Sequence, residues 1–354
     1  MAAVVESITM PTDGIDTSMS ARASLARLMD GYLATQLLYV AVKLGIPELL
    51  ADGRKSAQDV AARLGTEPTT THRVLRGLAA LTVLDEDQDG HFGLAGMGTL
   101  LRDGVPGSLR GATLARGDVY YRAGAELLGS ITDGEVAFER AYGNQFFAHL
   151  AANPSVGAAF QASMTDRSRH EAADVVAVVD YRRFTTVVDV GGGSGILLEA
   201  MLEANPALRG TLFDLPEVVD MARNRLEGTG AIQRCSFAAG DFFMTALPPG
   251  ELLVLSRVLH DWDDSSAVHI LRQCRAALRP GGRLHIVEAV LPERAGDVPA
   301  ITMMDLHMLL LFRNGRERTI AGYEALLVEA GFGLAAVVPT RSAVGLVVIE
   351  AECA

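Results

Sequence analysis

The sequence predicts an α/β protein in which a largely parallel sheet follows a separate helical domain. From Thr185 onward, short β-prone runs alternate with helix-compatible runs, as in strands joined by crossover helices. Residues 56–101 instead follow the order helix, turn, helix, hairpin. We therefore divide the chain into a loose tail (1–20), a helical domain (21–105), a helical connector (106–180) and an α/β domain (181–354).

Composition limits the classes of protein that this chain can represent. Of 354 residues, 49% are hydrophobic and 21% charged, which favours a sizeable core over disorder. The net charge of −12 argues against a nucleic-acid or anionic-membrane partner. Three scattered cysteines form no disulfide framework, and no His/Cys cluster has the spacing of a metal site. With no signal peptide and no apolar run approaching the roughly 18 residues of a membrane span, we expect a cytoplasmic protein.

The helical domain begins with a broad apolar stripe. Residues 21–50 are predicted to form two helices, the second restarting at Gly45-Ile46-Pro47. The stripe is wide enough to face more than its own small domain, so we expect an intimate homodimer. Next, Ser56 caps a helix that stops at Gly65, and Pro68 opens another.

A short hairpin follows this helix pair, completing a winged-helix layout. Such domains often bind DNA through their second helix. Here that helix carries few basic residues, and the hairpin tip, residues 85–89, is almost entirely acidic. A dimerising or structural use is therefore favoured over a DNA-binding regulator.

The α/β domain is organised around Val187–Gly195, where a strand runs into a glycine-rich turn and then a helix. Glycines permit positive φ and let a ligand approach the backbone N–H groups at the helix N-terminus. Five strands are predicted at 186–190, 210–214, 235–239, 251–255 and 284–288. Two more, 334–339 and 344–350, lie too close together for a crossover helix, so they should form an antiparallel hairpin at a sheet edge.

Ligands of such a sheet bind beyond the C-terminal ends of its strands. The second predicted strand ends on Asp214, placed to hold ribose hydroxyls, and the third on Asp241 beside Phe242, placed to bind adenine. A nicotinamide fingerprint fails, because its Gly spacing is not met from Gly191 or from Gly192. S-adenosylmethionine (SAM), with adenine, ribose and an amino-acid tail, fits better.

Six motifs in order, VVDVGGGSG, FDLP, GDFF, LSRVLHDWDD, LRPGGRLHIVEAVLPE and GRERT, resemble the small-molecule O-methyltransferases of the plant caffeate type and their bacterial natural-product relatives. The resemblance covers about residues 20–350. It implies a Rossmann-like, seven-stranded SAM-binding domain behind an N-terminal winged-helix dimerisation domain. It also implies methyl transfer from SAM to a hydroxyl, expected to be phenolic, of a small aromatic metabolite, with no metal.

The resemblance assigns site residues by position in this sequence. His260 is implied as the general base, flanked by the acids Glu288 and Glu317. The implied cofactor contacts are Gly191, Gly193, Asp214, Leu215, Gly240, Asp241, Phe242, Ser256, Arg257, Met164 and Ser168. Position 257 is usually Lys in the plant enzymes, and Arg does not reproduce its geometry. The implied substrate contacts are Asp261, Trp262, Met304, His307 and Met308.

The chemistry supports two acids around the base. A phenol has a pKa of about 10 and a histidine about 6.5, so a carboxylate beside the imidazole helps it to hold a proton. Two alternatives stay open: a SAM-binding relative with a hydroxylase-like or decarboxylase-like activity, and the DNA-binding regulator. The two acids beside His260 argue against the former.

Overall fold

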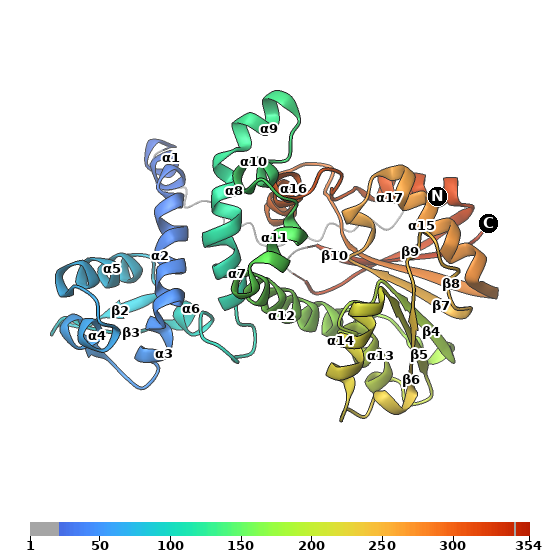
Figure 1. The fold of residues 1–354 in the computed structure, drawn as a ribbon, viewed down its shortest axis with the longest axis horizontal. Helices are drawn as coiled ribbons and strands as arrows, with labels where there is room; N and C mark the ends of the chain where they lie inside the picture. The colour runs from blue at the N-terminus through green and yellow to red at the C-terminus, as the bar shows by residue number, and fades with distance from the viewer. Residues whose placement is uncertain (1–20, 343–344) are drawn as a thin grey trace. The chain divides into compact units, whose positions relative to one another are not determined.

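The computed structural model describes residues 21–342 and 345–354, and Figure 1 draws the chain as a ribbon. The chain separates into two compact units, with the boundary between Pro106 and Gly107. Among the described residues, no helix combines the length and apolar character needed to cross a membrane.

The first unit opens with three helices, α1 (Ala21–Met29), α2 (Gly31–Leu44) and α3 (Ile46–Leu50). The predicted restart near Pro47 is confirmed, since Gly45 takes a left-handed conformation at φ 74° and Pro47 lies in the first turn of α3. The prediction of only two helices is wrong, because one residue, Asp30, separates α1 from α2. Asp and Gly are both poor helix formers, which explains a break at the Asp30-Gly31 pair.

The rest of this unit has the predicted helix, turn, helix and hairpin. Ser56 caps α4 by accepting a hydrogen bond from the N–H of Asp59 at 3.1 Å, and Gly65 ends the helix with φ 66°. The core contains Leu75, Leu78 and Phe92. The strands pair in the order β1-β3-β2. The elements are β1 (Lys55–Ser56), α4 (Ala57–Leu64), α5 (Pro68–Ala80), β2 (Leu84–Glu86), β3 (His91–Leu94) and α6 (Gly96–Thr99).

The second unit begins with helices, as predicted. The sequence predicts breaks between these helices at Gly117, Gly129, Asp133-Gly134, Gly143 and Asn153-Pro154. Those at Gly134, Gly143 and Asn153-Pro154 are confirmed, but Gly129 lies inside a helix and Gly117 inside a π-helical turn. Gly129 allows close packing instead, because a Cβ there would lie 2.5 Å from Nε of Arg140. The elements are α7 (Arg110–Ala115), the π-helical turn (Arg116–Tyr120), α8 (Tyr121–Ala125), α9 (Leu127–Asp133), α10 (Ala137–Tyr142), α11 (Phe146–Ala152) and α12 (Pro154–Val178).

A seven-stranded sheet forms the body of the second unit, in the order β6-β5-β4-β7-β8-β10-β9. Strands β4 to β8 are parallel, and β9 and β10 form the predicted antiparallel hairpin with β9 at the edge. This is the Rossmann-like arrangement. The strands are β4 (Thr186–Val190), β5 (Arg209–Asp214), β6 (Cys235–Ala239), β7 (Gly250–Ser256), β8 (Leu278–Ala289), β9 (Phe332–Pro339) and β10 (Leu346–Cys353).

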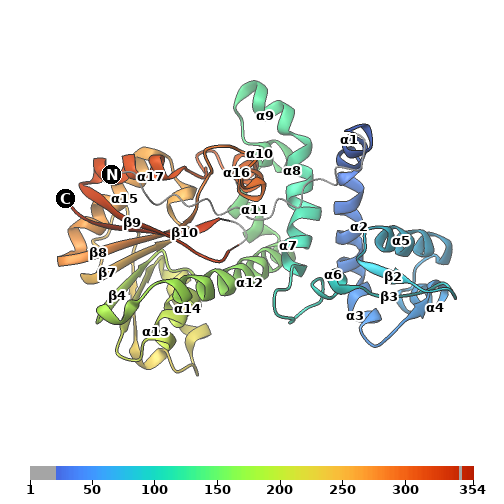
Figure 2. The same cartoon turned by 180° about the vertical axis from the view of Figure 1, so that it is seen from behind.

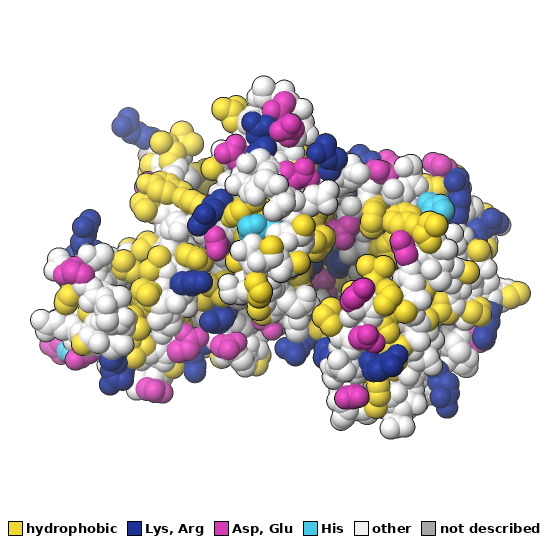
Figure 3. All heavy atoms as spheres, viewed as in Figure 1, with side chains coloured by type: hydrophobic (Ala, Val, Ile, Leu, Met, Phe, Trp, Pro, Cys, Tyr) yellow, Lys and Arg dark blue, Asp and Glu magenta, His cyan; other side chains and the backbone are white. Residues whose placement is uncertain are grey.

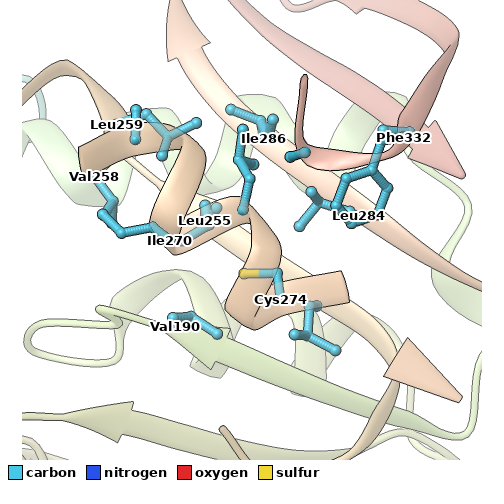
Figure 4. Close-up of a cluster of buried hydrophobic side chains, with 14 of the residues drawn as sticks. Val190, Leu255, Val258, Leu259, Ile270, Cys274, Leu284, Ile286 and Phe332 are labelled. Carbon is cyan, nitrogen blue, oxygen red and sulfur yellow. The ribbon is translucent and has the colours of Figure 1, made fainter. Parts of the chain in front are cut away.

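Helices cover both faces of this sheet, as Figures 1 and 2 show from opposite sides. One hydrophobic cluster, drawn in Figure 4, joins Val190, Leu255 and Ile286 to side chains of α15 and α17, while Val187 and Val254 pack in a second cluster with α12 and α13. Both faces of β4 and β7 are therefore buried, as expected for central parallel strands. The remaining helices are α13 (Ile196–Ala204), α14 (Pro216–Leu226), α15 (Asp264–Ala277), α16 (Pro299–Leu311) and α17 (Ile320–Ala330).

Candidate active site

Two cavities open side by side in the second unit, at the C-terminal ends of the central strands. The smaller, which we name the cradle, has a volume of about 120 Å³ and is lined by the glycine-rich turn, the end of β7 and α12. The larger, which we name the acceptor cavity, has a volume of about 670 Å³ and is lined by α12, α16 and the segment around Tyr120. Arg167, Glu171 and Arg257 line both.

The glycine-rich turn lines one side of the cradle. Gly191 has φ 69°, and a Cβ there would lie 2.9 Å from Cγ2 of Val258. The turn is held by Asp214 at the end of β5, whose carboxylate accepts the N–H of Gly193 at 2.8 Å and that of Leu215 at 2.7 Å. Burial raises the pKa of Asp214, and these two hydrogen bonds oppose the effect.

A second acid, Asp189 on β4, also lines the cradle, although neither its position within the strand nor the resemblance assigned it to the site. Its side chain is fully buried, and neither carboxylate oxygen has a hydrogen-bond partner within the described parts of the chain. Burial, reinforced by the charge of Asp214, raises the pKa of Asp189 to about 7.

The other expected cofactor contacts lie in three places. Gly191, Gly193, Ser256, Arg257 and Ser168 line the cradle, whereas Met164 lines the acceptor cavity. Gly240, Asp241 and Phe242 follow β6 and are partly buried without lining the cradle. Trp262, expected at the substrate, packs edge-on against Phe242 and Phe243, with ring centroids 5.8 and 4.7 Å away, and lines neither cavity.

His260 lies in a 3₁₀ turn just after β7, and both predicted acids are beside it. Its Nδ1 is 3.1 Å from Oε1 of Glu317 and 3.7 Å from Oε2 of Glu288. Glu288, at the end of β8, also accepts the N–H groups of Leu259 at 2.9 Å and of His260 at 3.3 Å. These contacts fix the ring, and His260 itself lines the acceptor cavity. A carboxylate at Nδ1 fixes the proton there, which leaves Nε2 as the basic nitrogen.

Arg257 contributes a buried cation to the same cluster. Its guanidinium is 3.3 Å from Glu288 through Nη1 and 3.1 Å from Glu317 through Nη2, and Nη2 also contacts Sδ of Met304 at 3.0 Å. The residue has φ 57°, a conformation that is uncommon outside glycine and is found most often at functional sites. Arg257 therefore contacts both acids as well as lining the cradle, where the resemblance implied only a cofactor contact.

The pKa values of the two acids are shifted in opposite directions. Burial raises the pKa of Glu288, although His260 and Arg257 oppose it. Burial also acts on Glu317, but the hydrogen bond with His260 and the charge of Arg257 outweigh it and lower its pKa. Glu317 is therefore the firmly ionised partner of the imidazole.

The ligand atoms of His260, Glu288 and Glu317 lie within 4.8 Å of one another, close enough for a metal ion. The Arg257 guanidinium, hydrogen-bonded to both carboxylates, already supplies the positive charge there. A second such group, Asp87, Asp89 and His91, lies in the exposed hairpin, where Asp87 accepts backbone N–H groups of the turn.

The acceptor cavity contains four of the five expected substrate contacts, Asp261, Met304, His307 and Met308. Burial, with a smaller effect of Arg116, lowers the pKa of His307 to about 4, so its ring is neutral at pH 7. Sequence reasoning missed most of the lining, because it comes from separate helices without a shared motif. The missed residues include Arg116, Tyr120, Phe147, Phe160, Arg167, Glu171 and Phe312.

Comparison with known proteins gives the same family for both parts of the chain. A family model described as the O-methyltransferase domain matches residues 125–333, and one described as the O-methyltransferase dimerisation domain matches residues 26–102. The chain is 41% identical over 329 residues to the phenazine O-methyltransferase PhzM of Lysobacter antibioticus, covering 93% of this chain and 95% of that protein.

Two further relatives are named for methylation at different atoms, one at nitrogen and one at oxygen. The 8-amino-8-demethylriboflavin N,N-dimethyltransferase of Streptomyces davaonensis is 37% identical, covering 86% of this chain and 88% of that protein. The solved structure of the O-methyltransferase NcsB1 from neocarzinostatin biosynthesis, in complex with SAM and 2-hydroxy-5-methyl naphthoic acid, matches with a TM-score of 0.76 and 35% identity, covering 91% of this chain and 96% of that one. The chain belongs to the SAM-dependent O-methyltransferases that carry an N-terminal dimerisation domain.

Proposed function

We propose that His260 is the general base that removes the proton from a phenolic hydroxyl of a small aromatic acceptor bound in the acceptor cavity. The observation that carries this proposal is the position of the His260 imidazole. Its Nδ1 is 3.1 Å from Oε1 of Glu317, and His260 lines the acceptor cavity. Asp261 Oδ1 lies 3.5 Å from Nε2, the nitrogen left to accept the proton.

Bound in the cradle, SAM supplies a methyl group on a positively charged sulfur, so the acceptor oxygen gains a C–O bond as the electrons of the C–S bond return to sulfur. His260 takes the hydroxyl proton on Nε2 and becomes an imidazolium. Glu317, ionised and hydrogen-bonded to Nδ1, stabilises that cation. Glu288 holds the turn that carries His260 by accepting the backbone N–H of Leu259. Positioning of the two reactants supplies much of the remaining rate enhancement.

The lining of the acceptor cavity supports an aromatic acceptor. Tyr120, Phe147, Phe160 and Phe312 offer flat apolar surfaces. Met304 and Met308, with flexible and polarizable side chains, adapt to planar rings. The relatives are named for phenazine and naphthoate substrates, which are flat aromatic molecules.

We also propose that the chain is a cytoplasmic homodimer whose α1 and α2 helices meet a second copy. Leu28, Met29 and Tyr32 are 76%, 70% and 54% exposed, far more than a large apolar side chain usually is on a monomer surface. Yellow hydrophobic atoms gather over α1 and α2 in Figure 3. In this proposal residues 21–105 form the dimerisation domain, 106–180 contribute to the acceptor cavity, and 181–354 form the SAM-dependent methyltransferase domain.

The decisive experiment measures methyl transfer and donor binding separately. The full-length protein is incubated with SAM and a panel of phenolic, amino-aromatic and quinone acceptors, and mass spectrometry detects each methylated product. His260→Asn should lower kcat for the best acceptor by about 10²- to 10⁴-fold. Affinity for S-adenosylhomocysteine should stay unchanged, because His260 does not line the cradle. A variant that turned over at the wild-type rate would refute the base.

A further inference from the structure

The long helix α12, which Figure 1 shows beside α13, presents two opposite charges to the cradle. Arg167 and Glu171 are four residues apart, so their side chains lie on the same face of the helix. Both line the cradle together with Gly191–Ser194. Neither belongs to a sequence motif, and the proposed mechanism gives neither a role.

These two side chains are close, but they do not form a hydrogen bond with each other. Nε of Arg167 and Oε1 of Glu171 are 3.7 Å apart, beyond hydrogen-bonding distance. Both atoms are buried and without a hydrogen-bond partner in the parts of the chain that the structure describes. The Glu171 side chain is 9% exposed, whereas the Arg167 side chain is 33% exposed, toward the cavities that it lines.

Unpaired buried polar groups are destabilising, and each therefore requires an explanation. A bound ligand with one negative and one positive group would satisfy both at once. Asp189, whose carboxylate oxygens also lack a hydrogen-bond partner among the described residues, lines the same cavity and offers further acceptor atoms. Burial lowers the pKa of Arg167, which an approaching carboxylate would reverse.

We propose that Arg167 and Glu171 form a clamp for the zwitterionic amino-acid tail of the methyl donor, with Arg167 donating to its carboxylate and Glu171 accepting from its ammonium group. The proposal rests on the cradle being the donor site. Guanidinium and carboxylate form strong charge-assisted hydrogen bonds, and Arg offers the fork geometry that matches a carboxylate. Because Arg167 also lines the acceptor cavity, a carboxylate on the acceptor is the competing occupant.

Two ligands that differ only in this tail test the clamp. S-adenosylhomocysteine carries the amino-acid tail, and 5′-methylthioadenosine lacks it but keeps adenine, ribose and thioether. Isothermal titration of the ligand-free, full-length protein with each ligand gives a ratio of affinities. Arg167→Met and Glu171→Gln should each weaken S-adenosylhomocysteine by about 10- to 100-fold, while methylthioadenosine binds within about twofold of wild type. Arg167→Lys, which keeps the charge, should recover part of the loss.

The matched control is Arg169→Met on the same helix, where the exposed Arg169 lies 3.6 Å from Asp166; this variant should bind both ligands as wild type does. The clamp is overturned if Arg167→Met weakens both ligands equally. It is also overturned if S-adenosylhomocysteine affinity is intact and only the KM of a carboxylated acceptor rises, which would assign Arg167 to the acceptor. Failure of the wild-type protein to bind either ligand would instead refute the donor site itself.

Discussion

Replacing Asp189 by Asn should stabilise the ligand-free protein at neutral and alkaline pH, by an amount that grows as the pH rises. The native side chain is fully buried, and neither oxygen has a hydrogen-bond partner among the described residues. Burial, followed by the charge of Asp214, raises its pKa from 3.8 to about 7. Between these values the native state keeps a proton that the unfolded chain has lost, so the free energy of unfolding falls as pH rises through this window.

The size of the effect follows from the two pKa values. A difference of about 3 pH units, at 1.36 kcal/mol per unit, corresponds to about 4 kcal/mol of native-state stability lost on passing from below pH 4 to above pH 7. Asn carries no charge, so the variant does not lose this stability as the pH rises. An unsatisfied amide adds a penalty of its own, but that penalty does not change with pH.

Urea unfolding of wild type and Asp189→Asn at pH 5, 6, 7 and 8 isolates the effect, because other titrating groups cancel in the difference. The variant's unfolding free energy relative to wild type should rise by about 3 kcal/mol from pH 5 to pH 8. Asp220→Asn, which removes an exposed carboxylate from α14, is the control for the loss of one negative charge. A difference between Asp189→Asn and wild type that stays constant over this range would refute the argument.

Three further predictions concern the cradle, the base and the dimer. Gly191→Ala should lower the unfolding free energy by about 1–3 kcal/mol and weaken S-adenosylhomocysteine in calorimetry, because φ is 69° and the new Cβ meets Val258 at 2.9 Å. Glu317→Gln should lower kcat and shift the pH–rate profile without changing donor affinity, since it removes the charge beside Nδ1 of His260. Leu28→Glu, on the exposed face of α1, should convert a dimer to monomer in light scattering; a wild-type monomer at micromolar concentration would contradict the dimer proposal.

Several residues of the candidate site could be placed from the sequence because they directly follow strands. Each strand of a parallel sheet delivers the residue that follows it to the same edge, so Gly191, Asp214 and His260 could be placed from strand ends alone. Glu317 was placed only by resemblance, since it lies in the segment between α16 and α17 and reaches the cluster through tertiary contacts. Its backbone N–H donates to Asp305, a contact 12 residues away that no periodicity indicates.

The errors have equally specific causes. The sequence suggested that Gly129 breaks a helix, but the glycine is there to leave room for Arg140. A second shortfall was an omission: the resemblance implied only a donor contact for Arg257, which lines the cradle but also hydrogen-bonds to Glu288 and Glu317. Such features depend on which side chains meet in space, and neither propensity nor spacing encodes that information.

The same contrast explains why one family can serve many acceptors. The proposed donor contacts come mainly from one sheet edge, and they rely on glycine conformations and acidic side chains that few other residues could replace. The acceptor cavity is instead lined by side chains of α7, α11, α12 and α16, and exchanging Phe147, Met304 or Phe312 for another apolar residue alters its shape without touching the sheet. A relative 37% identical to this chain is named as an N,N-dimethyltransferase, which is the divergence expected when acceptor selection rests on such exchangeable positions. Arg167 and Glu171 lie where the two cavities meet, so the charge pair that we assign to the donor tail also limits which acceptors can lie beside it.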